Sequence, residues 1–314
     1  MDEAQLDRAC GVVIASAAGD ALGAGYEFET VAADLEPGMI GGGLGNFAPG
    51  EWTDDTSMAV AVARAAATGD DLRSAAGLDA VAHGFADWFA SDPADIGIQT
   101  AQVLAEACRR PTGAGMAAAA HAAHERAGRS AGNGSLMRTG PVALAYLDDP
   151  EALVEAAIAV SALTHYEPDA TEACALWSLM IRHAVLTEDL PTFDHVAPWI
   201  PRPDHWRTVL STAAEAPPPT FTQNAWSIGA LQAAWSAIVH TPVPDGEPHH
   251  HLSRALVTAI RIGHDTDTVA AIAGALLGAR WGASAIPAGW TAILHGWPGI
   301  DAAALDEMAR QIVA

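Results

Sequence analysis

Runs of small apolar residues dominate the chain, and their polar interruptions fall at the spacing of helices rather than strands. Ala-rich stretches with few β-branched residues favour helix, and apolar and polar positions rarely alternate over more than four residues. We therefore predict an all-α fold. The expected helices cover residues 6–24, 57–67, 75–90, 97–109, 114–127, 150–163, 170–186, 222–240, 251–262 and 269–282.

Two long segments break this pattern, and we expect both to be irregular. Residues 30–51 include four glycines between positions 41 and 45. Long loops inside a compact domain usually cover or line a binding site, so we expect this loop to move as a lid with Glu27 at its root. Residues 190–219 carry seven prolines, and we predict no regular element there.

Small residues recur at every fourth position in the first and last predicted helices, at Ala15, Gly19 and Gly23 and at Gly274, Gly278 and Gly282. Glycine inside a helix costs about 1 kcal/mol relative to alanine, so a repeated glycine indicates close approach by another backbone. Two such helices could pack side by side. That packing would bring Asp20, an acid in the otherwise apolar first helix, near Asp265 and Asp267.

The most informative polar residues stand directly before two apolar helical runs. Segment 53–56 reads Thr-Asp-Asp-Thr, and segment 265–268 reads Asp-Thr-Asp-Thr. One oxygen-bearing side chain suffices to cap a helix, so one interpretation is a capping motif with spare acids. Four in a row exceed that need, and carboxylates with hydroxyls are ligands of hard cations. Because two acidic helix starts repel unless a positive charge lies between them, the pattern favours a metal pair.

The charge balance narrows the possible partners. The chain has 38 Asp and Glu against 15 basic residues, all of them Arg, and a net charge of −23. This charge disfavours nonspecific binding of nucleic acid or an anionic membrane, and we predict neither. The acidic N-terminus disfavours a signal peptide, and polar breaks in every long apolar run disfavour a membrane span. Three separated cysteines fit a reducing compartment, so we expect a cytoplasmic protein with one domain over residues 1–314.

Two other stretches contain residues that could bind a phosphate or a metal ion. Residues 130–138 interrupt the Ala-rich pattern with a small-residue turn that opens a helix. Such a turn can present backbone N–H groups to a phosphate, although Asn-Gly is also ordinary turn chemistry. The tract His249-His250-His251 lies in a loop rich in Pro, Gly and Asp, and we assign it no role.

Five motifs spread over most of the chain occur together in one order. They are Gly19-Asp-Ala-Leu-Gly23 followed by Glu27, Thr53-Asp-Asp-Thr56, Gly132-Asn-Gly134 with Met137-Arg138, Thr164-His165, and Gly263-x-Asp265-Thr-Asp267-Thr268. In this order they resemble the ADP-ribosylglycohydrolase family, which includes the dinitrogenase-reductase-activating glycohydrolases and the vertebrate ADP-ribosyl-acceptor hydrolases. The resemblance spans about residues 10–282.

The resemblance implies an all-α orthogonal helical bundle with two divalent cations, Mg²⁺ or Mn²⁺, in a central cleft. The metal ligands it implies are Thr53, Asp54 and Asp55 for one set, and Asp265, Asp267 and Thr268 for the other. It implies a catalytic or gating role for Glu27. The substrate contacts it implies are Ser130, Gly132, Asn133, Gly134 and His165. The expected substrates are ADP-ribosylated proteins or small molecules, with ADP-ribose as the product.

The implied reaction cleaves the glycosidic bond at ribose C1″. Its oxocarbenium-like transition state calls for charge stabilisation and an activated water. Two cations could fix the ribose hydroxyls and lower the pKa of a bound water. Asp54 or Asp55 could take the proton of that water, and so could Glu27 if its loop closes.

Two other interpretations stay open at this point. One is a catalytically weak ADP-ribose-binding protein of the same fold, which a turnover measurement would distinguish. The other is a helical scaffold whose Asp pairs are only caps, which predicts no tight binding of divalent cations. The sequence also departs from the family pattern at two places. His264 stands where several relatives have Gly, and Ala131 stands where one branch has a substrate-contacting Tyr, so the acceptor is not fixed.

Overall fold

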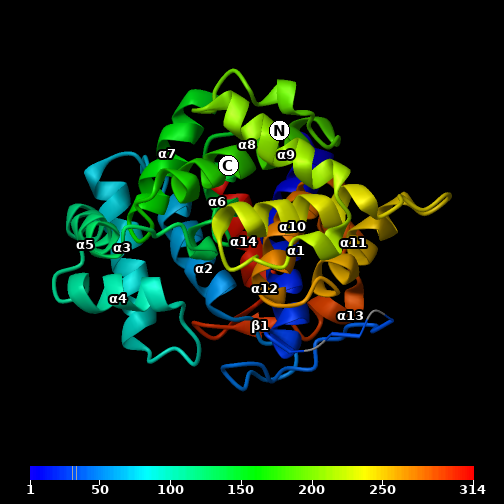
Figure 1. The fold of residues 1–314 in the computed structure, drawn as a ribbon, viewed down its shortest axis with the longest axis horizontal. Helices are drawn as coiled ribbons and strands as arrows, with labels where there is room; N and C mark the ends of the chain where they lie inside the picture. The colour runs from blue at the N-terminus through cyan, green and yellow to red at the C-terminus, as the bar shows by residue number, and fades with distance from the viewer. Residues whose placement is uncertain (30, 33) are drawn as a thin grey trace.

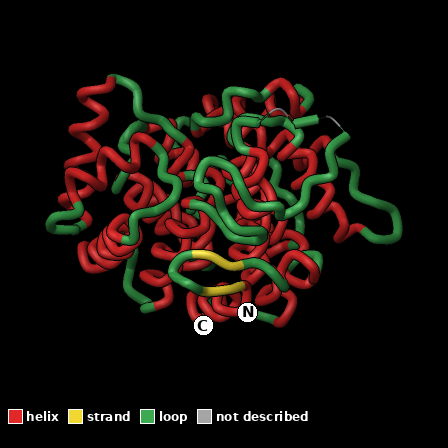
Figure 2. Tube along the Cα trace, turned by 90° about the horizontal axis from the view of Figure 1, so that it is seen from below, coloured by secondary structure: helices red, strands yellow, loops and turns green. Residues whose placement is uncertain are grey.

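The fold is helical almost throughout, as the apolar pattern predicts (Figures 1 and 2). The computed structural model describes residues 1–314 with the exception of Thr30 and Ala33. Its α-helices are α1 (Glu3–Gly23), α2 (Asp54–Ala67), α3 (Ala75–Ala90), α4 (Ile98–Ala107), α5 (Gly113–Ala127), α6 (Gly140–Ala145), α7 (Pro150–Ala162), α8 (Pro168–Thr187), α9 (Pro203–Glu215), α10 (Ser227–His240), α11 (His251–Ile260), α12 (Thr266–Trp281), α13 (Ala288–Thr291) and α14 (Ala302–Ile312). Two short strands, β1 (His295–Gly296) and β2 (Ile300–Asp301), form an antiparallel pair.

Helices α1 and α12 lie side by side at the centre of the fold (Figure 1). A Cβ added at Gly19 would lie 2.3 Å from the Ala270 carbonyl oxygen, and one at Gly23 would lie 2.5 Å from Cα of Asp267. On the other helix, a Cβ at Gly274 would lie 2.2 Å from the Ala15 carbonyl oxygen. The glycines are therefore required by backbone contact, and the predicted packing of the two striped helices is confirmed.

The apolar character of α1 follows from this central position. By length and composition the segment Glu3–Tyr26 could cross a membrane, but 89% of its apolar window is buried inside the protein. Neighbouring helices cover it, and the large side chains Trp52, Trp88, Trp177 and Trp206 are buried in the same core. The Trp177 indole N–H donates to the Ile272 carbonyl at 3.0 Å and so holds α8 against α12.

The prediction of an irregular segment over residues 190–219 is wrong, because the segment contains the 13-residue helix α9. Pro203 occupies the first turn of α9, where a missing N–H costs nothing. Pro217 and its neighbours follow the C-terminal end of the helix. The prolines therefore mark the boundaries of a helix and do not prevent it.

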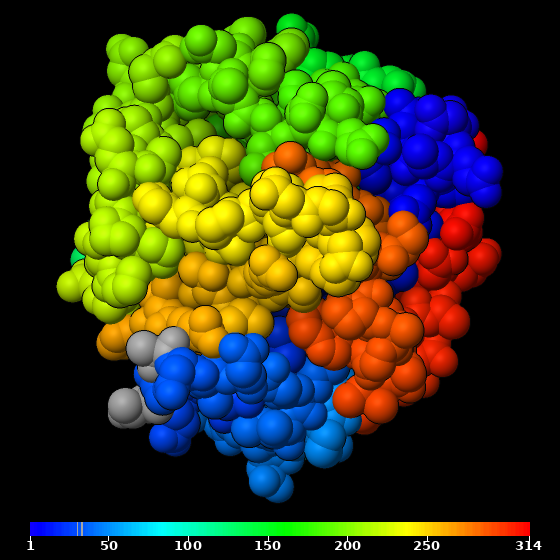
Figure 3. Space-filling view, turned by 90° about the vertical axis from the view of Figure 1, so that its right-hand side faces the viewer, coloured from blue at the N-terminus to red at the C-terminus, as the bar shows by residue number. Residues whose placement is uncertain are grey.

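The described part of the loop 30–51 is irregular, as predicted; Thr30 and Ala33, on which the loop prediction also falls, lie outside the described residues. A Cβ added at Gly43 would lie 2.1 Å from the Ala24 carbonyl oxygen, and Gly43 has a φ of 65°. The glycines thus allow a close backbone approach at a positive φ. The Arg261 guanidinium donates to the Leu35 carbonyl, and the His295 N–H donates to the Gly50 carbonyl. The described residues of this loop therefore lie against the segments near 261 and 295 (Figure 3).

Candidate active site

A cavity of about 570 Å³ collects most of the residues that the sequence singles out. Those on its wall are Glu27, Asp54, Ser130, Gly132, Asn133, Gly134, His165, Asp265, Asp267 and Thr268. Thr53 and Asp55 lie buried directly behind this wall. Segments more than 200 residues apart in the sequence therefore meet at one site, because α1 and α12 pack closely and α2 begins beside them.

The N-terminus of α2 is capped by Asp20 of α1 and not by its own acids. The Asp20 carboxylate accepts the backbone N–H groups of Thr53 at 2.9 Å and Thr56 at 3.0 Å, and it accepts the Thr56 hydroxyl at 2.6 Å. The Thr53 side chain makes no capping hydrogen bond. Asp54 and Asp55 are therefore free of the capping role. At α12, Asp265 is the N-cap residue but makes no side-chain cap bond, whereas Asp267 accepts the Thr268 backbone N–H at 2.9 Å. Capping therefore accounts for only one of these four acids, and the capping-only interpretation is wrong.

The carboxylates form two groups that share Asp267. Asp20, Asp55 and Asp267 make one group and Glu27, Asp265 and Asp267 make the other, with the oxygens of each group within 4.8 Å of one another. Asp55 links the two helix starts, because its Oδ2 accepts the Thr53 hydroxyl at 3.1 Å and the Thr268 hydroxyl at 3.4 Å. These acidic clusters can hold divalent cations, since carboxylate and hydroxyl oxygens suit Mg²⁺ or Mn²⁺.

Two buried oxygens in this cluster, Oε2 of Glu27 and Oδ1 of Asp55, have no hydrogen-bond partner among the residues that the structure describes. Buried polar atoms without a partner are rare, and in a native protein each calls for an explanation such as an ion. Both atoms lie beside other carboxylates, although a buried carboxylate oxygen normally accepts a hydrogen bond from a donor group. A cation bound in the cluster would supply the missing partner.

Burial and mutual repulsion raise the pKa values of these acids. Burial first, and then the negative charges of Asp265 and Asp95, raise the pKa of Glu27 to about 9. The pKa of Asp54 is raised to about 8 by burial and by the charge of Asp95. The pKa values of Asp55 and Asp267 are also raised well above their ordinary value, chiefly by burial. A nearby positive charge would reverse these shifts.

Two residues of the site were missed by the sequence analysis. Asn224 is buried, and its side chain accepts the backbone N–H of Asp265 at 3.2 Å and donates to the Gly263 carbonyl at 3.1 Å. Asp95 lies on the cavity wall between α3 and α4. Both stand in loops without a motif, so only the three-dimensional arrangement identifies them.

Asn133, which the resemblance places among the substrate contacts, also supports the acidic cluster. Its side-chain amide donates to Oδ2 of Asp265 at 2.8 Å and to the Asn224 carbonyl at 2.9 Å. The amide nitrogen is therefore already engaged, and it fixes the orientation of an acid on the cavity wall. An outer residue of this kind sets the direction in which a candidate metal ligand points.

The opposite wall is built around His165 and the turn at 132–134. A Cβ added at Gly132 would lie 3.2 Å from Nε2 of His165, and one at Gly134 would lie 3.1 Å from Cε1. The two glycines therefore let the imidazole lie directly against the turn. The His165 ring is buried, and burial together with the charge of Arg138 lowers its pKa to about 3.

Ser130 lies at the edge of this wall, in a segment 128–132 that reads Gly-Arg-Ser-Ala-Gly and has the spacing of a hydrolase nucleophile elbow. Its hydroxyl is 2.7 Å from Nδ1 of His124, and its backbone N–H donates to Glu167. Glu167 approaches the same nitrogen of His124, at 4.0 Å, and the segment follows a helix rather than a strand. These residues therefore do not form a Ser-His-Glu triad, in which the acid binds the other ring nitrogen.

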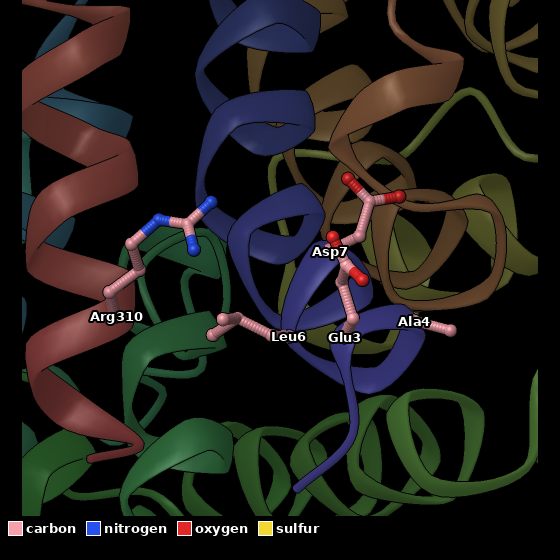
Figure 4. A pocket seen from close by; sticks show the side chains of 5 residues that line it. All are labelled: Glu3, Ala4, Leu6, Asp7 and Arg310. Carbon is pink, nitrogen blue, oxygen red and sulfur yellow. The ribbon is translucent and has the colours of Figure 1, made fainter.

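A second hollow of about 560 Å³ lies at the N-terminal end of α1 (Figure 4). It is lined by Glu3, Ala4, Leu6 and Asp7 of α1 and by Arg310 of α14. The Arg310 guanidinium is engaged by Asp306 of its own helix at 2.6 Å. No residue of the acidic cluster or of the 130–134 turn lines this hollow, so the other cavity is the candidate active site.

The all-α fold and the buried carboxylates that face the cavity can now be compared with those of known proteins. A family model described as ADP-ribosylglycohydrolase matches residues 1–314. The chain belongs to the ADP-ribosylglycohydrolase family, and its enzyme class is that of a glycohydrolase. The resemblance drawn from the five motifs is confirmed.

Relatives and a solved structure agree with this assignment. The chain is 30% identical to ADP-ribosyl-[dinitrogen reductase] glycohydrolase of Rhodospirillum rubrum, over 90% of this chain and 89% of that protein. It is 28% identical to ADP-ribosylarginine hydrolase Tri1 of Pseudomonas putida (strain GB-1), over 92% and 74% respectively. A solved structure described as an ADP-ribosylglycohydrolase-related protein complex superposes with a TM-score of 0.75 at 26% identity, over 99% of each chain. The all-α fold is therefore that of the family.

Proposed function

We propose that the protein is a dinuclear-metal-dependent hydrolase that cleaves the glycosidic bond at ribose C1″ of ADP-ribosylated substrates and releases ADP-ribose. One observation carries the proposal. The acidic starts of α2 and α12 converge on one wall of a 570 Å³ cavity, and the 130–134 turn with His165 forms the opposite wall. A cavity of this size suits a ligand with several polar groups.

The residues present fit a pair of Mg²⁺ or Mn²⁺ ions. We assign Thr53, Asp54 and Asp55 to one ion and Asp265, Asp267 and Thr268 to the other. The membership of Asp55, Asp265 and Asp267 in the two carboxylate groups supports this assignment, and so does Oδ1 of Asp55, which has no hydrogen-bond partner among the described residues. Asp54 belongs to neither group, and Glu27 offers a further carboxylate to the second one. When bound, the two ions would supply Lewis-acid activation of water and would offset the repulsion among the carboxylates.

Glu27 is the proposed proton acceptor. It lies on the cavity wall, and within the described part of the chain its Oε2 has no hydrogen-bond partner that would compete for a proton. Its pKa of about 9 means that Glu27 is protonated at neutral pH as long as no positive charge lies beside it. Positive charge in the cluster lowers that pKa, so that the carboxylate ionises and can take a proton from an attacking water at Oε2. Asp54 and Asp55 are the alternatives, because they adjoin the same cluster.

The opposite wall is proposed to hold the ADP-ribose moiety. Gly132, Gly134 and His165 present backbone and imidazole groups to the cavity, while Ser130 and Asn133 frame the turn. A neutral imidazole can donate to an oxygen of the substrate without adding a charge. This wall therefore positions the substrate, and the acidic wall performs the chemistry.

We propose a cationic acceptor, of which ADP-ribosylated arginine is the leading case. Asp95 lies on the cavity wall beside Glu27 and Asp54, and the raised pKa of Asp95 follows from its burial. A guanidinium leaving group would find negative charge there. Two relatives, a dinitrogen reductase glycohydrolase and an ADP-ribosylarginine hydrolase, support a protein-linked or arginine-linked substrate.

The test is release of ADP-ribose from a panel of mono-ADP-ribosylated arginine, serine and O-acetyl substrates. Each reaction is run with Mg²⁺, with Mn²⁺ and with EDTA. We expect release from the arginine substrate that depends on a divalent cation. Binding of ADP-ribose without release from any substrate, under either cation, would instead identify a catalytically weak ADP-ribose-binding protein.

A further inference from the structure

A completely buried arginine lies directly behind the turn that lines the cavity. Arg138 is 0% exposed, and its guanidinium lies 4.4 Å from the centre of the Phe85 ring. Among the described residues it forms no ion pair, and its Nε has no hydrogen-bond partner. Burying a charge without a carboxylate partner is costly, and hydrogen bonds to the guanidinium offset part of that cost. Its remaining contacts show which groups accept those hydrogen bonds.

The guanidinium is connected to His165 through one hydroxyl. Nη1 of Arg138 donates to the Gly134 carbonyl at 3.0 Å, and Nη2 donates to Oγ1 of Thr164 at 2.7 Å. Oγ1 of Thr164 lies in turn 2.8 Å from Nδ1 of His165. One side chain therefore holds both the turn and the histidine that faces it.

The direction of these hydrogen bonds follows from counting hydrogens. Arginine can only donate, so the Thr164 hydroxyl oxygen must be an acceptor in its contact with Arg138. The single hydrogen of Thr164 is then left for Nδ1 of His165, which is its only other partner among the described residues. If Nδ1 carried the proton instead, the Thr164 hydrogen would be buried without an acceptor. In a neutral imidazole the proton then resides on Nε2.

We infer that Arg138 and Thr164 are positioning residues, which fix His165 as the neutral Nε2–H tautomer and aim a hydrogen-bond donor into the cavity at an oxygen of the substrate. His165 lines the cavity, and Nε2 has no hydrogen-bond partner in the described part of the chain. The inference rests on the proposed function for the identity of the substrate. The tautomer itself is a property of the protein alone.

The electrostatics of the site agree with a neutral imidazole. Arg138 remains charged at neutral pH, because burial lowers its pKa only to about 10. Its positive charge adds to burial in lowering the pKa of His165 to about 3. The substrate oxygen therefore meets a fixed neutral donor, backed by a cation that the cavity cannot reach. Such preorganisation avoids the ordering cost that a freely rotating donor would incur on binding.

The first test is ¹⁵N NMR of the metal-free protein labelled at histidine. The signals of His165 are assigned as those lost in the His165→Gln variant. We expect protonated Nε2 and unprotonated Nδ1 at pH 7. An Nδ1–H tautomer or an imidazolium would overturn the inference. Because this test needs neither turnover nor metal, its result is independent of whether the proposed hydrolysis is found.

Two ligands show which oxygen Nε2–H reaches. If Nε2–H donates to the diphosphate, ADP and ADP-ribose should both shift the Nε2 resonance. If Nε2–H donates to the terminal ribose, only ADP-ribose should shift it. A resonance that responds to neither ligand, at concentrations where ADP-ribose binds, would overturn the donor role.

Substitutions at Thr164 separate positioning from mere packing. Thr164→Val removes the hydroxyl, so we expect a mixture of His165 tautomers and a roughly tenfold weaker affinity for ADP-ribose, the order of one hydrogen bond to a charged oxygen. Thr164→Ser keeps the hydroxyl and should keep the tautomer. The matched control is Thr139→Val, which removes a buried hydroxyl that lies 2.9 Å from the Ser178 hydroxyl. Equal loss of affinity in the Thr139 and Thr164 valine variants would overturn the inference.

Discussion

The two walls of the cavity differ in how completely their polar groups are satisfied. On the acidic wall, Glu27 and Asp55 each keep a buried oxygen that has no partner among the described residues, and burial raises the pKa of Glu27 to about 9. On the opposite wall, the hydroxyls and the imidazole form a continuous set of hydrogen bonds from Arg138 to His165. One wall therefore lacks a positive partner, and the other carries its own buried cation.

This difference indicates where ligands complete the structure. Polar groups that are linked by hydrogen bonds rigidify a site, whereas buried carboxylates without partners store unfavourable free energy. The acidic wall is thus expected to depend on metal for its stability and activity. The opposite wall is expected to be preformed and insensitive to metal. The predictions below test this contrast, from the largest expected effect to the smallest.

The largest effect is expected from Asp267, the acid shared by both carboxylate groups. Asp267→Asn should lower kcat/KM by roughly three orders of magnitude, because it removes a proposed ligand of the metal pair. The free energy of unfolding of the metal-free variant should not fall, because Asn cannot ionise and so adds no buried negative charge. The control is Asp204→Asn, in the first turn of α9, which is exposed. Activity within a few-fold of wild type in Asp267→Asn, in steady-state assays, would contradict the metal assignment.

Glu27 comes next, because it is proposed to act only on the proton. Glu27→Gln should lower kcat by about 10²-fold, the usual contribution of a general base, and keep most of the affinity for ADP-ribose. Steady-state kinetics and calorimetric binding separate the two quantities. If the variant turns over at the wild-type rate, Asp54 or Asp55 is the base instead of Glu27. Equal loss of binding and turnover would mean that Glu27 stabilises the bound substrate rather than the transition state.

Metal and pH should act together on the stability of the acidic wall. The folded-state pKa values of Glu27 and Asp54, about 9 and about 8, exceed the ordinary values of 4.5 and 3.8. Folding therefore favours the protonated acids, and this contribution is complete below about pH 4 and lost as the pH rises towards 9. At pH 8 to 9, Mg²⁺ or Mn²⁺ at a hundred times its Kd should restore about 2.7 kcal/mol.

Thermal unfolding of the metal-free protein at pH 5 and pH 9, with and without the cations, measures this effect. The cation-induced rise in Tm should shrink in Asp267→Asn. Glu27→Gln, which cannot ionise, should weaken the pH dependence of the metal-free protein. A Tm that does not change when divalent cations are added at pH 9 would show that the acidic wall is stable without them.

Local rules predicted the helices and the acidic starts of α2 and α12 from sequence. The glycine stripes of α1 and α12 also predicted the packing that brings Asp20 and Asp267 together, because a repeated glycine has few other reasons to occur in a helix. The chemistry of the acidic wall followed from this packing, since carboxylates in such a density require a counter-charge.

Other parts of the site depend on contacts between segments that carry no local signal. Asp20 caps α2 across a helix–helix contact, so sequence could not show that Asp54 and Asp55 are free. Asn224 holds Asp265 from a loop between α9 and α10. Helix α9 was missed because its flanking prolines have the same composition as an irregular segment. In each case the information lies in three-dimensional proximity or in exact position, not in composition.

The smallest effect is expected from Ser130, at the edge of the preformed wall. Its hydroxyl is already engaged by His124 at 2.7 Å and its backbone N–H by Glu167. A group with partners in the free protein gains little when it exchanges them for a ligand, because the net value of the exchange is near zero. Ser130→Ala should therefore weaken ADP-ribose binding by no more than about threefold, or roughly 0.6 kcal/mol, with kcat unchanged. Calorimetric titration with ADP-ribose measures this, and His165→Gln in the same titration sets the scale for a donor that is free before binding. A loss above tenfold in Ser130→Ala would mean that the hydroxyl leaves His124 for the substrate, and that this wall rearranges on binding rather than being preformed.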